Sequence, residues 1–89
     1  MERKVLVNEI IHFCLKYGIL KYPVTARKFK NIERELANAE FVEGLINTII
    51  LKARIHKNTD INKLKELLLE LERLRLELEY KDSDEADVI

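Results

Sequence analysis

Glu9 and His12 are the two residues whose spacing comes closest to that of a chemical site. Side chains at positions i and i+3 of a helix project together, and helical di-metal sites use a Glu-x-x-His pair of this kind. In a homodimer, two such pairs with Glu40 or Glu43 would complete a carboxylate–histidine site, which is a remote alternative. Glu9 and His12 share their helix face with Lys16, however, opposite the apolar residues of that segment. The sequence therefore favours a solvated polar face with no bound metal.

A second group of interest is basic. Arg27, Lys30 and Arg34 recur at i, i+3 and i+7, with Asn31 and Asn38 beside them. A basic strip at the start of a helix suits phosphate contacts, because the helix N-terminus adds its own partial positive charge. A solvated face that pairs with nearby carboxylates explains the same residues. Nucleic-acid binders usually carry excess positive charge, and the net charge here is zero, so nucleic-acid binding is the alternative rather than the preferred function.

Enzymatic chemistry and cofactor binding find no support in the sequence. There is no Gly-rich phosphate loop, no Cys/His cluster and no nucleophile placed beside a base. The single cysteine, Cys14, lies among apolar residues that raise a thiol's pKa, and one cysteine cannot form a disulfide within its chain. The longest uncharged run, residues 44–51, is too short to span a bilayer. We expect a non-enzymatic, cytoplasmic protein without a cofactor or membrane contact.

The elements that position these groups are expected to be helices. Two glycines and one proline among 89 residues leave little material for the turns of a β fold. Periodicity and end signals predict an all-α, antiparallel three-helix bundle with helices at about residues 3–17, 26–56 and 60–80. Gly18 ends the first helix, Thr25 caps the second, and Thr59 or Asp60 caps the third.

The second predicted helix is unusually long, and its apolar face changes direction. One face is formed by Phe29, Ile32, Leu36 and Ala39, and a second face, rotated by about a quarter turn, by Val42, Ile46, Ile49 and Ala53. A bend at Gly44 would account for the rotation by splitting the helix, which would give four helices in all.

The stretch LLLELERLRLELEY, residues 67–80, has seven leucines in fourteen positions. Its second half alternates like a strand, but residues 62–80 contain no Gly, Pro or β-branched residue, so a helix is predicted. One broad stripe, formed by Ile61, Leu64, Leu67, Leu68, Leu71, Leu74 and Leu78, suits a core. Leu69, Leu76 and Tyr80 form a second strip with no obvious partner inside one chain. The acidic residues 81–89 are predicted to be a disordered tail.

Charged residues are distributed unevenly along the chain. Residues 1–58 carry eleven Lys or Arg against six Asp or Glu, whereas residues 59–89 carry five against ten. The opposite net charges of the two parts favour the last helix folding back onto the others.

Surplus apolar helix surface without a chemical site predicts a small adaptor or regulatory protein that acts by protein–protein interaction. We expect it to self-associate as a homodimer, through helices packed as in a coiled coil, and to bind a protein partner that the sequence does not identify. The predicted interface residues are Leu69, Leu76, Tyr80, Leu45, Ile49 and Leu51.

Overall fold

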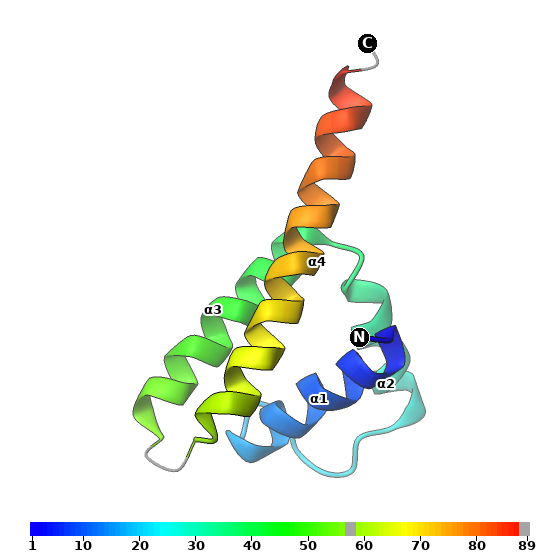
Figure 1. Cartoon of the computed structure of the whole chain (residues 1–89). Helices are drawn as coiled ribbons and strands as arrows, with labels where there is room; N and C mark the ends of the chain where they lie inside the picture. Colours follow the sequence, from blue (N-terminus) through cyan, green and yellow to red (C-terminus); the bar gives the residue numbers. More distant parts are fainter. Residues whose placement is uncertain (57–58, 88–89) are drawn as a thin grey trace.

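The computed structural model describes residues 1–56 and 59–87, with side chains described as far as Lys81. All regular structure in this part of the chain is α-helical: α1 (Arg3–Lys16), α2 (Ala26–Glu35), α3 (Ala39–Ile55) and α4 (Ile61–Asp87) (Figure 1). The all-α prediction is confirmed, and residues 67–80 are helical throughout. The described residues form four helices, which is the alternative to the three-helix prediction.

Helix α1 ends at a glycine in the left-handed conformation, as the sequence predicts. Gly18 has φ +73°, and its N–H donates to the carbonyl of Leu15 at 3.3 Å. The N–H of Ile19 donates to the carbonyl of Cys14 at 2.8 Å. This pair of hydrogen bonds is a Schellman motif, which satisfies carbonyls that the end of a helix otherwise leaves free.

The two glycines predict substitution effects of opposite sign. Gly18→Ala is expected to destabilise the protein by about 1–2 kcal/mol, because an L side chain is strained at positive φ although no atom lies within 4 Å of the added Cβ. Gly44→Ala also meets nothing within 4 Å but lies inside α3, so it should stabilise by roughly 0.5–1 kcal/mol. Urea unfolding of both variants checks the pair. If both substitutions changed the free energy of unfolding by the same amount in the same direction, the explanation given for the two glycines would be wrong.

The prediction of one continuous helix over residues 26–56 is wrong. The Thr25 hydroxyl accepts a hydrogen bond from the Lys28 N–H at 3.1 Å, as expected for the cap of α2. The helix then ends at Glu35, and α3 begins at Ala39.

The break comes from the residues around Asn38 and not from Gly44. The N–H groups of Ala37 and Asn38 donate to carbonyls three residues back, at 3.1 and 2.9 Å, which tightens the last turn of α2. The Asn38 side chain then accepts from the Glu40 N–H at 3.0 Å and caps α3. Gly44 lies inside α3, which continues past it without interruption.

Helices α3 and α4 lie side by side and antiparallel, and α1 packs on both α2 and α4 (Figure 1). The shared core draws buried side chains from all four helices: Leu6, Val7, Ile10, Ile11, Phe13 and Cys14 of α1, Ile32 of α2, Val42 and Ile49 of α3, and Leu67, Leu71 and Leu74 of α4, together with Tyr17 and Leu36. Ile61 is an exception to the predicted stripe, because it is exposed at the start of α4.

His56, after the end of α3, and Thr59, before the start of α4, both contact Tyr17 at the end of α1. The Tyr17 hydroxyl donates to the Thr59 hydroxyl at 3.1 Å, and the Tyr17 ring stacks on His56 with centroids 4.9 Å apart. Asp60 is the cap of α4, since its carboxylate accepts from the N–H groups of Asn62 and Lys63. Of the two predicted caps, Asp60 is therefore the one used.

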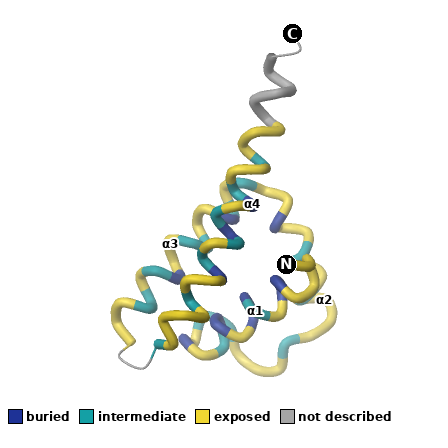
Figure 2. Tube along the Cα trace, viewed as in Figure 1, coloured by how far each residue is buried: buried dark blue, intermediate teal, exposed yellow. Residues whose placement is uncertain are grey.

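Helix α4 continues past its predicted end at Tyr80 to Asp87. No Gly or Pro interrupts residues 81–87, so the tail predicted to be disordered is helical this far, and residues 88–89 lie outside the described residues. Leu78 is the last described side chain of α4 that packs against the core. Beyond it, α4 projects away from the other helices (Figure 1), and residues 79–81 are exposed (Figure 2).

Candidate functional site

Three large apolar side chains lie exposed on one side of α4. Leu69, Leu76 and Tyr80 retain 54%, 53% and 68% of their accessible surface. Their spacing of seven and then four residues places them on one face of the helix. We call these three residues the outer face of α4.

The outer face lies opposite the side of α4 that packs into the core. Leu67, Leu71 and Leu74 on the packed side are buried, with exposures of 6% or less. At 100° per residue, Leu69 and Leu76 fall roughly half a turn round the helix from these core residues. The excess of leucine in this segment therefore supplies two faces, of which the fold of one chain covers one.

An ion-pair network flanks one side of the outer face. The Arg75 guanidinium donates to both carboxylate oxygens of Glu72, with Nε to Oε2 at 3.1 Å, and to Glu79 Oε1 at 2.9 Å. The hydrogen bond from Arg75 lowers the pKa of the Glu72 carboxyl, and the two carboxylates in turn raise the pKa of Arg75. Such i, i+3 and i, i+4 pairs stabilise the helix surface itself.

A smaller group of charged residues borders the other side of the outer face. Arg73 lies 3.4 Å from Glu70, and Glu70 also lies 3.5 Å from the amino terminus of Met1. The outer face is thus an apolar strip between two charged borders. This is the pattern of a helix that packs against another helix, where charges border the apolar seam.

The other predicted interface residues divide into two groups. Leu51 of α3 is 61% exposed, but Leu45 is half-buried against the core and Ile49 is fully buried at 0%. The assignment of Ile49 to an external interface is wrong, because this side chain completes the chain's own core.

A second exposed apolar area, at the end of the α3–α4 pair, is missed by the sequence reasoning. Ile55 and Ile61 are 69% and 62% exposed. Ile61 lines a shallow groove with Leu64, Leu68 and residues from the end of α3. The sequence could have indicated that Ile55 belongs to an exposed apolar face, because it lies four residues after Leu51 on the same side of the helix.

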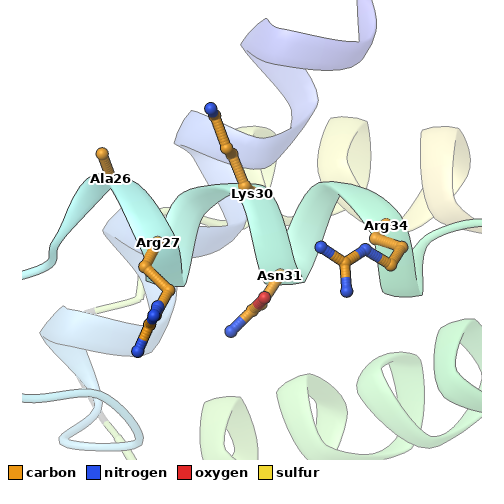
Figure 3. Close-up of a pocket in the computed structure, with 5 residues that line it drawn as sticks. All are labelled: Ala26, Arg27, Lys30, Asn31 and Arg34. Carbon is orange, nitrogen blue, oxygen red and sulfur yellow. The ribbon is translucent and has the colours of Figure 1, made fainter.

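The predicted basic strip lies on the exposed surface of α2. Arg27, Lys30, Asn31 and Arg34 line an open depression, and Figure 3 shows Arg27 and Asn31 projecting to one side of the helix. Lys30 leaves the helix in the opposite direction in this view. No carboxylate of the described side chains pairs with these cations. The structure thus places all three predicted cations along one depression of α2.

The residues weighed as metal ligands are not gathered into one site. His12 is exposed and Glu9 half-buried on α1, whereas Glu40 and Glu43 are exposed on α3. Among the described side chains, no group of three or more His, Cys, Asp or Glu residues is arranged to hold a metal ion.

Cys14 is buried in the core, as the sequence predicts. Burial raises the pKa of its thiol, which disfavours the reactive thiolate.

None of the helices in the described part of the chain combines the length and hydrophobicity needed to cross a membrane. Comparisons with protein-family models, with curated protein sequences and with solved structures find no match to this chain.

Proposed function

We propose that this protein is a small non-enzymatic helical adaptor or regulator that acts by protein–protein interaction and self-associates through the outer face of α4. The observation that carries this proposal is the strip of Leu69, Leu76 and Tyr80, each more than half exposed and bordered by charges. Exposed leucines are common singly, but a strip repeated over three turns of one helix is typical of a contact surface.

The projecting end of α4 supports the same proposal. Residues 79–87 continue the helix beyond Leu78, the last described side chain of α4 packed on the core. Helical segments of this length gain little stability in water without packing against a neighbour. A second helix laid along the outer face would supply that packing.

The size of the apolar strip sets the expected strength of association. Burying the remaining surface of a large apolar side chain contributes about 1–1.5 kcal/mol when half of it is already covered. Six such side chains in a dimer would contribute roughly 6–9 kcal/mol, against an association cost of at least about 4 kcal/mol. Self-association is therefore expected to be weak enough to depend visibly on protein concentration.

Light scattering coupled to size-exclusion chromatography tests the proposal. The protein concentration should range from about 20 μM to about 2 mM, since a net gain of at most about 5 kcal/mol corresponds to a Kd of about 0.2 mM or weaker. The mass should rise from near the 10.5 kDa of one chain toward twice that value. A constant monomer mass over the whole range would show that the outer face does not bind a second copy.

Nucleic-acid binding is the second candidate, supported by the basic depression of α2, whose Arg27 and Arg34 pair with no carboxylate among the described side chains. If α2 contacts phosphates, fluorescence anisotropy with a labelled DNA or RNA duplex should detect binding at low salt that weakens steeply as salt is added. The double variant Arg27→Glu/Arg34→Glu should then lose that binding while its circular dichroism is unchanged. No change in anisotropy at about 20 mM salt would exclude this candidate.

A further inference from the structure

We infer that α4 pairs with α4 of a second copy in the antiparallel orientation, so that Leu69 of each chain packs on Leu76 of the other. The inference rests on the proposed self-association and adds its orientation and register. In this alignment the twofold axis passes between positions 72 and 73. Each Tyr80 then lies level with Lys65 of the second copy.

The apolar strip by itself allows two alignments. Because Leu69 and Leu76 are seven residues apart, two copies can match them in parallel, each leucine with itself, or antiparallel, each leucine with the other. The parallel alignment would also place the two Tyr80 rings at the same level. Leucine spacing therefore limits the register but does not choose the orientation.

Charge favours the antiparallel alignment. The sequence of the projecting end, residues 79–87, has five Asp or Glu and one Lys, a net charge of −4. In a parallel pair this end lies beside its own copy, within about one Debye length of 8–10 Å. In the antiparallel pair its residues 79–84 lie beside residues 61–66, which carry two Lys and one Glu. Like-charge repulsion thus penalises only the parallel form.

The packing available to the projecting end of α4 also favours the antiparallel orientation. The first half of α4 is anchored in the core through Leu67, Leu71 and Leu74, whereas the end beyond Leu78 is not. An antiparallel partner places each projecting end against the anchored half of the other chain. A parallel partner would leave the two projecting ends supported only by each other.

Two variants, each with one added cysteine, distinguish the orientations. Lys65→Cys and Glu79→Cys both replace exposed residues beside the outer face, and positions 65 and 79 lie nearly level in the antiparallel register. In this register, position 65 of one chain lies about 22 Å along the helix axis from position 65 of the other chain, at 1.5 Å per residue. The two positions 79 are about 20 Å apart by the same measure. Disulfides need Cα atoms within about 7 Å. Cys14 does not compete, because it is buried.

The experiment mixes the two variants in equal amounts, oxidises them mildly and identifies the three disulfide linkages by mass spectrometry of the non-reduced proteolytic peptides. The antiparallel pair predicts a 65–79 heterodisulfide at least about tenfold more abundant than either homodisulfide. Dominant 65–65 and 79–79 products would overturn the orientation but leave self-association through α4 intact. A statistical mixture, in which the heterodisulfide is only twice each homodisulfide, would overturn the α4 interface as well. Adding Leu69→Glu and Leu76→Glu to both variants is the control, and it should abolish any preference.

Discussion

Leu71→Glu is expected to abolish cooperative folding at neutral pH. The Leu71 side chain is 0% exposed and lies on the inner side of α4 between Leu67 and Leu74. Loss of a buried leucine's packing costs about 2–5 kcal/mol. Keeping the new carboxyl neutral at pH 7 costs a further ~4 kcal/mol, because its ordinary pKa is near 4.3. The sum approaches the whole stability of a chain this size, roughly 4–13 kcal/mol at ordinary values per residue.

Far-UV circular dichroism with urea titration measures this effect. The Leu71→Glu chain should have lost most of its helix signal or unfold without a cooperative transition, whereas Leu71→Met should unfold within about 1.5 kcal/mol of the unsubstituted chain. The single variant Leu69→Glu, two residues away on the outer face, is the matched control and should fold normally. A cooperative Leu71→Glu transition close to that of the unsubstituted chain would show that α4 packs through another face.

Helix ends that depend on one residue and its nearest neighbours were predictable from the sequence. Gly18 ends α1 at positive φ, and Thr25 caps α2 through its hydroxyl. Both act within four residues of their own position, so a short window contains the whole cause. The helical state of residues 67–80 is equally local, because strong helix formers occupy nearly every position.

The break between α2 and α3 has a weaker local signal. Ala37, Ala39 and Glu40 all suit a helix, and Asn38 alone favours a cap. The quarter-turn rotation of the apolar face is the second signal, and the structure shows that it arises at residues 36–38. Assigning it to Gly44 is wrong because a single glycine costs a helix only about 1 kcal/mol, which neighbouring contacts can offset.

The candidate site was predictable only in part, because periodicity identifies apolar faces without saying what covers them. Leu51 and Ile49 both lie on apolar faces of α3, yet Leu51 is exposed and Ile49 is buried. The difference depends on contacts between segments far apart in the sequence, such as the packing of α4 on α3. The outer face of α4 was recognisable because it lies opposite a leucine stripe that already supplies the contribution of α4 to the core.

The double variant Leu69→Glu/Leu76→Glu is expected to remain folded and to lose self-association. Both side chains are more than half exposed, so the added carboxylates stay in water in the monomer and little packing is lost. In the antiparallel pair, four glutamates would meet in the middle of the seam in place of four leucines. Losing the leucine contacts alone, at about 1 kcal/mol each, weakens the dimer by roughly 4 kcal/mol, a thousandfold rise in Kd.

The matched control for this variant is Leu51→Glu/Ile55→Glu, because it also adds two carboxylates at exposed apolar positions of one helix face. Leu51 and Ile55 are 61% and 69% exposed on α3, so the two variants differ mainly in the face that they charge. Light scattering at about 2 mM should report a monomer for the α4 variant and a mass that rises toward that of a dimer for the α3 variant. The reverse result would move the interface to α3, and a monomer for both variants would mean that both faces are buried on association. The urea transition of both variants should stay close to that of the unsubstituted monomer, since neither substitution reaches the core that Leu71 and Ile49 share.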